Sequence, residues 1–371
     1  MNILIAPDKM KGSISAQEIC DIVENGILSY DKSIKVVRCP LADGGDGTLA
    51  VIQNQKELEI VDLVVEDPLG RPVEAYYCMS ENEAYIELPI ASGLALLSDN
   101  ESNPMHTSTY GTGQLMQHAI KNGCKMIYLM LGGSSTNDVG IGILSALGYR
   151  FLDTSGELVQ PIGKNLIHIK TIDDSEVPDL AHIDMRILCD VTNPLCGPNG
   201  AAHVFGKQKG ANPEEIKFLD QGVKSFASTV EQFNGVNINS FSGAGAAGGI
   251  AAGLFGLCNA EILPGFQTIA DMVDLRHKVL SSDIVISGEG RLDNNSFEGK
   301  VVGGIHTLCE EYKKPLFLIV GDNICSENVL SKKGIEIATV SSLAQNIEDA
   351  QRNVRQYLKQ ITEEFLKGII S

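Results

Sequence analysis

The stretch Leu129–Leu144 reads LMLGGSSTNDVGIGIL and joins the end of a strand, a glycine-rich loop and the start of a helix. The apolar run Met126–Leu131 predicts a short buried strand. This run stops at Gly132-Gly133, and apolar residues return at helical spacing from Val139. A helix that begins after such a loop presents free backbone N–H groups, which favour an anion. Ser, Thr, Asn and Asp also cap ordinary helices, so the stretch alone is equally consistent with an N-cap.

The same alternation of strand, loop and helix occupies both ends of the chain. Asn2–Ala6 and Lys35–Cys39 are short apolar runs, and the helix between them, Ser15–Tyr30, begins with the capping box Ser15-x-x-Glu18. The alternation returns beyond about Gly265, with strands at Ile284–Ser287, Leu316–Val320 and Ile335–Val340 and helices at Gly299–Tyr312, Ser326–Lys332 and Ile347–Leu366. The last helix carries an apolar face formed by Ile347, Ala350, Val354, Tyr357, Leu358, Ile361 and Phe365. Two N-terminal and three C-terminal strands predict one five-stranded parallel sheet.

The middle of the chain follows a different pattern. Glu59–Glu66, Val73–Met79 and Ala84–Leu88 predict short strands of an antiparallel meander. A chain of 371 residues also exceeds one ordinary core. We therefore expect a discontinuous α/β domain, residues 1–66 and 266–371, with a mixed α/β domain inserted at residues 67–265.

The segment Ser242–Gly256, SGAGAAGGIAAGLFG, contains the spacing G-x-G-x-x-G at Gly243, Gly245 and Gly248. A dinucleotide-binding loop requires a hydrophobic strand directly before its glycines, and the residues before this motif, VNINSFS, do not form one. We interpret the segment as a tightly packed helix of small residues. The sequence therefore argues against an NAD-dependent oxidoreductase.

The composition is that of a globular protein with an excess of acidic residues. The formal net charge is −18, and no basic run occurs, so we expect neither nucleic acid nor an anionic membrane as a partner. No apolar segment reaches a membrane-spanning length. The nine cysteines include no CxxC pair, which argues against zinc and indicates a reducing, cytoplasmic compartment. An anionic substrate would have to gather the few cations locally, and the cations to follow are Lys11, Lys207, Lys209, Arg291 and Lys300.

Five polar, glycine-rich loops follow or interrupt the apolar strands, and they hold the candidate site residues. In chain order these loops are PDKMKGS, with Asp8, Lys11 and Ser13; ADGGDGT, with Asp43, Gly44, Gly45, Gly47 and Thr48; GGSSTND, with Gly132, Gly133, Ser134, Thr136, Asn137 and Asp138; CDVTNPLCG, with Asp190 and Asn193; and SGEGRLDNNSFEGK, with Gly288, Glu289, Gly290, Arg291, Asp293, Ser296 and Lys300.

Together the loops contain the groups that phosphoryl transfer requires. A phosphate donor needs backbone N–H groups and cations around its oxygens, carboxylates to hold magnesium, and a base to accept a hydroxyl proton. The glycines let the backbone approach a ligand without Cβ obstruction. The carboxylates are those of Asp43, Asp190, Glu289 and Asp293, and the cations are Lys11, Arg291 and Lys300.

Each of these residues taken alone also has an ordinary structural explanation. Asp-Gly pairs such as Asp43-Gly44 are common turn formers, and Arg291 with Asp293 would suit a surface ion pair. The recurrence of the same combination at several strand ends is what favours a function. The seven histidines show no metal-ligand spacing, and the chain has neither a G-x-S-x-G elbow nor a Walker motif.

A series of motifs identifies the resemblance of the chain to a known family. They are APDKMKGS, PLADGGDGT, DPLGRPVEA, TSTYGTG, GGSSTNDVGIG, CDVTNPLCGPNGA, FGKQKGA, SGAGAAGG and SGEGRLDNNSFEGK. In this order they resemble the bacterial glycerate kinases that lack a P-loop, from about Asn2 to beyond Gly321. The resemblance implies an ATP- and magnesium-dependent kinase of D-glycerate. It also implies a flavodoxin-like domain made of both chain ends with an inserted α/β domain, in agreement with the segmentation above.

For this activity we expect the active site in the cleft between the two domains. Lys11 or Arg291, with groups of Gly132–Thr136, would hold the substrate carboxylate. The Asp43–Thr48 and Gly288–Lys300 loops would hold the ATP phosphates and magnesium. The expected base is Asp190, and the candidate metal ligands are Asp190, Glu289 and Asp293.

The sequence leaves several alternatives open. The acceptor is the 2- or the 3-hydroxyl, and the resemblance favours 2-phosphoglycerate. A related small hydroxy acid is another possible substrate, and a sugar-acid sensor that keeps the binding cleft is the non-enzymatic alternative. The oligomeric state is also open, a homo-oligomer included.

Overall fold

A computed structural model describes residues 1–297, 299–326, 330 and 335–370 of the chain. It divides into two compact units. The first contains Met1–Asp43, Ala50–Gln55 and Gly265–Ser371, and the second contains Gly44–Leu49 and Lys56–Pro264. In the described part no helix is long and apolar enough to cross a membrane.

The first unit is built on a parallel sheet in the order β15-β13-β11-β1-β2, which confirms the predicted five-stranded sheet for the described residues. Its strands are β1 (Asn2–Ile5), β2 (Lys35–Arg38), β11 (Ile284–Ser287), β13 (Leu316–Val320) and β15 (Glu336–Thr339). A short parallel pair, β12 (Arg291–Leu292) with β14 (Asp322–Asn323), lies beyond β11 and β13. Its helices are α1 (Ala16–Tyr30), α9 (Gly265–Met272), α10 (Leu275–Leu280), α11 (Val301–Tyr312), α13 (Ile347–Arg352) and α14 (Val354–Ile370).

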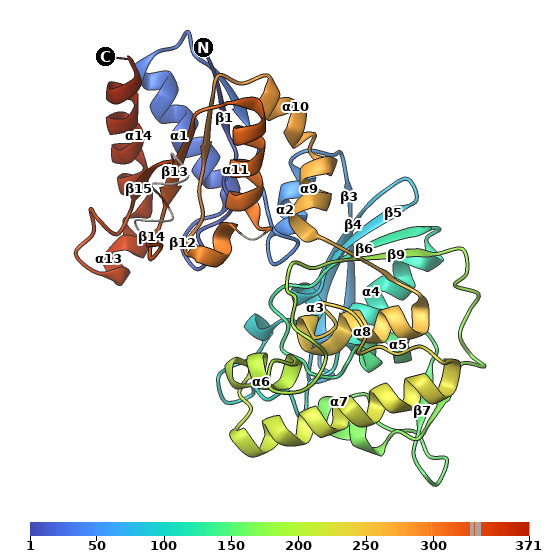
Figure 1. Ribbon diagram of the computed structural model, residues 1–371. Coiled ribbons are helices and arrows are strands. Elements are labelled where there is room, and N and C mark those ends of the chain that lie inside the picture. The colour runs from blue at the N-terminus through green and yellow to red at the C-terminus, as the bar shows by residue number, and fades with distance from the viewer. Residues whose placement is uncertain (298, 327–329, 331–334, 371) are drawn as a thin grey trace. The chain divides into compact units, whose positions relative to one another are not determined.

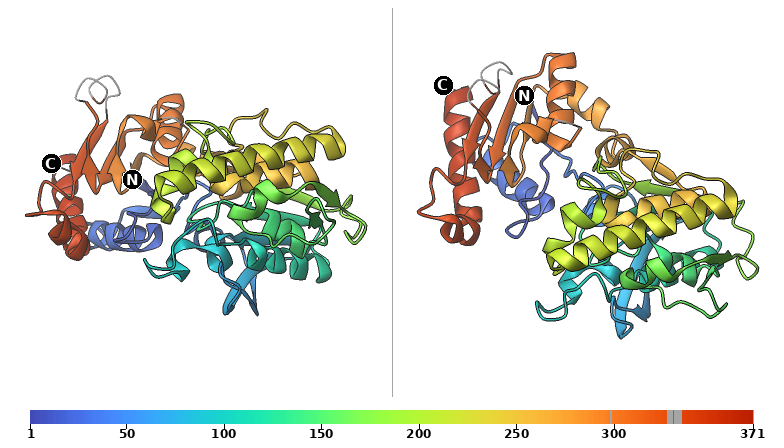
Figure 2. Two further views of the ribbon diagram at one scale, coloured as in Figure 1. Left: turned by 90° about the horizontal axis from the view of Figure 1, so that it is seen from below. Right: turned by 60° about the horizontal axis from the view of Figure 1, so that its bottom comes forward.

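Helices cover both faces of this sheet (Figures 1 and 2). On one face α1 and α14 pack against the strands, where Phe317 of β13 stacks on Phe365 of α14 with ring centroids 4.1 Å apart. On the other face lies α11, with Val302 and Ile305 fully buried. The three central strands, β1, β11 and β13, are buried on both faces, which explains why they are continuous apolar runs without alternation.

The second unit is built on a mixed sheet in the order β10-β9-β6-β5-β4-β3. The meander β3 (Glu59–Glu66), β4 (Pro72–Ser80) and β5 (Glu83–Glu87) is antiparallel, and β5, β6 (Met126–Met130), β9 (Asp184–Leu188) and β10 (Glu261–Leu263) run parallel. A separate hairpin pairs β7 (Arg150–Leu152) with β8 (Thr171–Asp173). The helices are α3 (Pro89–Ser92), α4 (Tyr110–Lys121), α5 (Ile141–Ala146), α6 (Ala201–Phe205), α7 (Pro213–Asn234) and α8 (Ala246–Cys258), and α2 (Thr48–Gln53) extends from this unit into the first.

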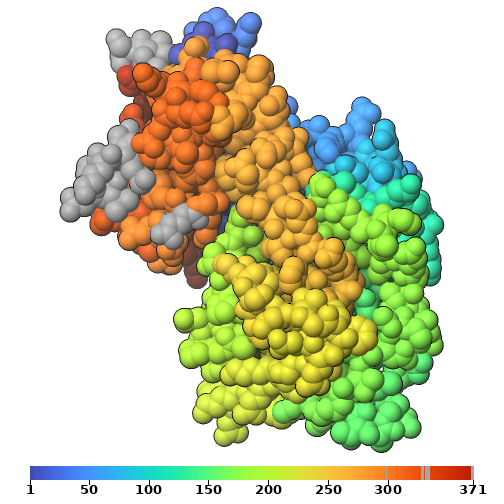
Figure 3. Space-filling model, turned by 45° about the vertical axis from the view of Figure 1, so that its right-hand side comes forward, coloured from blue at the N-terminus to red at the C-terminus, as the bar shows by residue number. Residues whose placement is uncertain are grey.

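The long helix α7 lies on the outside of the second unit (Figure 3, yellow-green to yellow). Asn212 caps it in a capping box with Glu215, and Pro213 lies in its first turn. Its apolar face enters the core of the unit, where Phe226 meets Phe151 of β7 edge-on. The other face remains in solvent.

The division into units differs from the sequence-based segmentation at its first boundary. Residues 59–66 form β3, which pairs with β4 along its whole length and so belongs to the second sheet. Sequence analysis placed this strand in the first domain, because the change of rhythm becomes visible only at the turn that follows it.

The C-terminal helix also differs from its prediction. The structure divides it at Asn353 into α13 and α14, and Asn353 donates to both the backbone carbonyl and the side chain of Asp349. The predicted apolar face is buried in α14, whereas Ile347 on α13 is 77% exposed. The predicted helix Ser326–Lys332 lies mostly outside the described residues.

Candidate active site

The sheet of the first unit has one position at which its topology reverses. From β1 the chain continues to β2 on one side, and it returns later as β11 on the other side of β1. Parallel α/β sheets bind ligands at such a switch point, beyond the carboxyl ends of the strands. The loop after β1 carries Asp8 and Lys11, and the loop after β11 carries Glu289 and Arg291. The fold therefore brings the first and the last of the five predicted loops together.

The loop after β11 lies against the loop after β1 and against the end of β13. The Asp8 N–H donates to the Gly288 carbonyl at 2.8 Å. A Cβ on Gly288 would overlap the carbonyl of Ile319, and a Cβ on Gly290 would lie 3.3 Å from the backbone nitrogen of Lys11. The absence of side chains at Gly288 and Gly290 therefore lets these backbone segments pack together, and their predicted role in ligand binding stays a prediction.

Asp8 and Glu289 place two half-buried carboxyl groups at this switch point. Burial, reinforced by the Asp8 carboxylate, raises the pKa of Glu289 to about 7. Burial also raises the pKa of Asp8 to about 6, against the opposing charge of Lys9. Lys300, at the start of α11, lowers both pKa values. Glu289 Oε1 is buried and has no hydrogen-bond partner among the described residues, and such perturbed carboxyls in a cavity are typical of functional sites.

Glu289→Gln tests this arrangement in the ligand-free protein. The folded state holds Glu289 at a higher pKa than the unfolded chain does, so it binds more protons between about pH 4.5 and 7, and stability falls as the pH rises through this window. The uncharged amide removes this contribution. In EDTA we expect the melting temperature of the variant to approach that of the wild type near about pH 5 and to exceed it at about pH 8. Identical pH dependences of the two melting temperatures would contradict the assignment.

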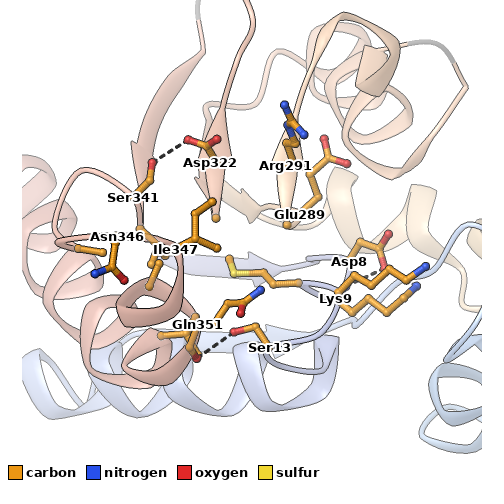
Figure 4. A pocket seen from close by; sticks show the side chains of 18 of the residues that line it. Asp8, Lys9, Ser13, Glu289, Arg291, Asp322, Ser341, Asn346, Ile347 and Gln351 are labelled. Atoms are coloured by element: carbon orange, nitrogen blue, oxygen red, sulfur yellow. Dashed lines mark hydrogen bonds and ion pairs between the residues drawn. The ribbon is translucent and has the colours of Figure 1, made fainter. Parts of the chain in front are cut away.

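A cavity of about 760 Å³ opens at this edge and is lined by residues of the first unit alone. Figure 4 shows Asp8, Lys9, Glu289 and Arg291 on one side of it and Asn346 and Ile347 on the other. Lys11 and Ser13, the other candidates from the loop after β1, also line the cavity. Lys11 is exposed, and Ser13 donates from Oγ to the Gln351 carbonyl at 3.2 Å. Of the candidates in the loop after β11, Glu289, Gly290 and Arg291 line the cavity, whereas Gly288, Asp293, Ser296 and Lys300 do not. Asp43, after β2, completes the charged side.

Asp293 and Ser296 are engaged with each other in a local turn. The Asp293 carboxylate accepts from the N–H groups of Asn295 at 2.8 Å and Ser296 at 3.0 Å, and Ser296 Oγ accepts from the Asp293 N–H at 3.0 Å. This is the capping pattern of the 3₁₀ turn Asn294–Phe297. Of the two predicted metal ligands in this loop, Glu289 is the one with a buried oxygen that has no hydrogen-bond partner among the described residues.

The other predicted loops lie wholly or partly in the second unit, where two of them follow the carboxyl ends of its parallel strands. Because β6 and β9 are parallel neighbours, with Met130 opposite Leu188, the Gly132–Asp138 loop and Asp190 follow at the same edge. The glycine-rich loop with Gly44, Gly45, Gly47 and Thr48 belongs to this unit as well. A Cβ on Gly132 would overlap the backbone of that loop.

The helix start that sequence analysis offered as an anion site is occupied by the chain itself. The helix α5 begins at Ile141, later than expected, and the N–H groups of Gly140 and Gly142 donate to the Asp138 carboxylate. Asp138 is fully buried and also accepts from the N–H and hydroxyl of Thr109, at 2.9 and 2.7 Å. Asp138 therefore holds the loop in shape, and the ordinary-cap interpretation is correct for this helix start.

The cation at this loop is Lys209, which the site prediction omitted although the sequence marked it as one of few cations. It is 2% exposed, and its Nζ donates to Ser134 Oγ at 2.7 Å and to the Thr136 carbonyl at 2.6 Å. Burial lowers the pKa of Lys209 to about 7, with the Asp138 charge opposing the shift. Beside it the Thr136 hydroxyl and both side-chain polar atoms of Asn137 are buried without a hydrogen-bond partner among the described residues. The sequence offered a signal for Lys209, since this residue lies in FGKQKGA, one of the motifs that carry the family resemblance.

Asp190 and Asn193 shape and border the same edge. Asp190 is half-buried just beyond β9. Asn193 donates from Nδ2 to the Asn199 carbonyl at 3.0 Å and accepts the Gly245 N–H on its own carbonyl at 3.0 Å. Asn193 thus connects its loop to the start of α8, where Gly248 and Gly249 have φ of 76° and 91°. Two of the five predicted loops lie in the first unit and two in the second, and the loop with Asp43 and Thr48 is divided between the two units.

The chain is similar to known proteins over nearly its whole length. The model of the glycerate kinase family matches residues 3–369. The chain is 36% identical to a glycerate kinase of Bacillus subtilis (strain 168) over 100% of this chain and 98% of that one, and 34% identical to glycerate 2-kinase of Escherichia coli (strain K12) over 95% of each. A crystal structure of a protein assigned as glycerate kinase 2 from Salmonella typhimurium LT2 superposes with a TM-score of 0.82 at 34% identity, covering 99% of both chains. The chain is a kinase and belongs to the glycerate kinase family.

Proposed function

We propose that the protein transfers the γ-phosphoryl group of ATP to the 2-hydroxyl of D-glycerate, giving 2-phosphoglycerate and ADP. The observation that carries the proposal is the convergence of Asp8, Lys11, Glu289 and Arg291 on one cavity at the switch point of a parallel sheet. Cations beside carboxylates at such an edge suit the phosphates of a nucleotide. The family supports glycerate as the acceptor, and the name of the E. coli relative supports its 2-hydroxyl.

The donor set of the charged side fits magnesium. Mg²⁺ in phosphoryl-transfer sites is commonly held by one or two carboxylates together with phosphate oxygens and water. Asp8 and Glu289 would provide the carboxylates, and the unpartnered Glu289 Oε1 supports this role. Bound there, the ion would neutralise the negative charge of the phosphates. Lys11, Arg291 and Lys300 supply further positive charge.

In the second unit, we propose that Lys209 and the Ser134–Asn137 segment hold the carboxylate of D-glycerate. A buried ammonium beside unpartnered amide and hydroxyl groups is costly without a ligand, and an anion that accepts from these donors offsets the cost. Asp190 borders the same loop and is the proposed base. It takes the proton of the 2-hydroxyl as the oxygen bonds to phosphorus and ADP leaves.

The Michaelis constant for D-glycerate is expected to depend on pH through Lys209. Burial lowers the pKa of Lys209 to about 7, so the ammonium group loses its proton in the free enzyme as the pH rises above neutrality. A bound substrate carboxylate stabilises the ammonium form, so Lys209 stays protonated in the complex. The KM for D-glycerate should therefore rise above about pH 7, by up to about tenfold per pH unit. Initial rates at saturating ATP across this range measure the effect. A KM that stays flat to about pH 9 would remove Lys209 from carboxylate binding.

A coupled assay of ADP release tests the activity. D-Glycerate should support turnover that depends on both ATP and magnesium. Tartronate and L-glycerate are tested in the same assay as alternative phosphoryl acceptors. Release of ADP that is independent of any acceptor would contradict the proposal.

A further inference from the structure

The cavity of the first unit extends well beyond the charged residues that the proposed function uses. Its far side is formed by residues after β13 and β15 and along α13 and the start of α14. Figure 4 shows this side opposite Asp8 and Glu289. D-Glycerate is too small to need both sides, since cavities of about 300–1,000 Å³ enclose much larger ligands.

The far side combines an apolar surface with an exposed rim. Val340 and Val354 form its buried floor at 1% exposure each, and Ala344 and Ala350 lie half-buried beside them. Ile347 stands at the rim with 77% of its surface exposed. The sequence periodicity predicts Ile347 on the core face of one long helix, but the break at Asn353 leaves it at the cavity. A position where the local pattern and the fold disagree is where a functional role is expected.

Hydrogen-bonding groups surround this apolar surface. The side chains of Gln345, Asn346 and Gln351 are exposed around the cavity and carry both donors and acceptors. Asn346 uses its Oδ1 to cap α13, accepting from the Asp349 N–H at 2.9 Å. Asp322 follows β13 and accepts from Ser341 Oγ at 2.9 Å through one carboxylate oxygen. This places an acidic side chain between the charged side and the apolar side of the cavity.

We infer that this far side binds the nucleoside of ATP, with the base between Ile347 and Ala350 and the ribose hydroxyls on Asp322. The inference rests on the proposed function, which places the phosphates on the charged side of the same cavity. A purine has apolar faces and a polar edge. Its faces match the apolar surface over Val340 and Val354, and its edge matches the surrounding side-chain amides of Gln345, Asn346 and Gln351. A carboxylate one strand away from the phosphate loop matches the ribose hydroxyls, as at other switch-point nucleotide sites.

Two substitutions separate nucleoside binding from phosphate binding. Ala350→Phe fills the apolar side, and Ile347→Glu places a charge where the base would lie. Binding of ATP and of inorganic tripolyphosphate, both with magnesium, is measured by calorimetry on the full chain. Each variant should weaken ATP binding by at least about tenfold, because the apolar contact of the base is lost. In Ala350→Phe the affinity for tripolyphosphate, which has no nucleoside, should stay within about twofold of wild type.

Ile60→Glu is the matched control, since Ile60 is 53% exposed on β3 in the second unit and lines no part of this cavity. It should leave both affinities unchanged. Unchanged ATP affinity in both cavity variants, or an equal loss of ATP and tripolyphosphate in Ala350→Phe, would overturn the inference. A wild-type protein that binds neither compound and releases no ADP would instead overturn the proposed function.

Discussion

Asp190→Asn is expected to lower kcat for D-glycerate by about 10²- to 10⁴-fold, the usual contribution of a positioned base. The amide keeps the size of the side chain but cannot accept the hydroxyl proton. Asp190 belongs to the second unit, whereas the proposed nucleotide site is formed by the first, so the Kd for ATP should not change. Single-turnover rates with saturating ATP and D-glycerate measure the chemical step directly.

Asp184→Asn provides the control on the same strand. Asp184 begins β9, at the end opposite to Asp190, and its carboxylate accepts from Arg186 at 2.8 Å. Since a partly exposed ion pair contributes little, this variant should retain wild-type kcat. Near-normal single-turnover rates in Asp190→Asn would show that Asp190 is not the base and that another group accepts the hydroxyl proton.

Lys209→Met is expected to raise the KM for D-glycerate by about 10- to 100-fold, because a charge-assisted hydrogen bond to the substrate carboxylate is lost. Methionine has a similar length and shape, so the packing around the buried stem is largely kept. The KM for ATP should remain close to that of the wild type. The melting temperature is measured alongside, since the Thr136 carbonyl loses a donor in the variant.

Lys207→Met is the matched control for this substitution. Lys207 lies in the same 3₁₀ turn, Lys207–Lys209, but its side chain is exposed. The loss of one surface charge should leave both Michaelis constants unchanged. A normal KM for D-glycerate in Lys209→Met would restrict Lys209 to a structural role beneath the loop.

The parallel sheet and its loops could be predicted because their signals are local. The central strands β1, β11 and β13 are apolar runs that lead into polar loops, and burial on both faces makes such runs continuous. The boundary at β3 could not be predicted in this way. In sequence, an apolar strand of one sheet cannot be distinguished from an apolar strand of the other. Only the pairing of β3 with β4 shows that β3 belongs to the second unit.

Side-chain roles were harder to predict than positions, for reasons that specific residues illustrate. Asp138 and Asp190 both follow strands of one sheet, yet the Asp138 carboxylate already accepts four hydrogen bonds from its own chain. Lys209 is far from its loop in sequence, so its bond to Ser134 depends on tertiary structure. Ile347 obeys the helical periodicity of its neighbours, and only the helix break at Asn353 removes it from the core.

Phosphorus NMR of the reaction mixture shows directly which hydroxyl of D-glycerate receives the phosphoryl group. With ATP, magnesium and D-glycerate, we expect a phosphomonoester signal that coincides with added authentic 2-phosphoglycerate and grows as the γ-phosphate signal of ATP declines. A signal that coincides with 3-phosphoglycerate would contradict the proposed acceptor hydroxyl. Inorganic phosphate as the sole new signal would contradict transfer to glycerate altogether.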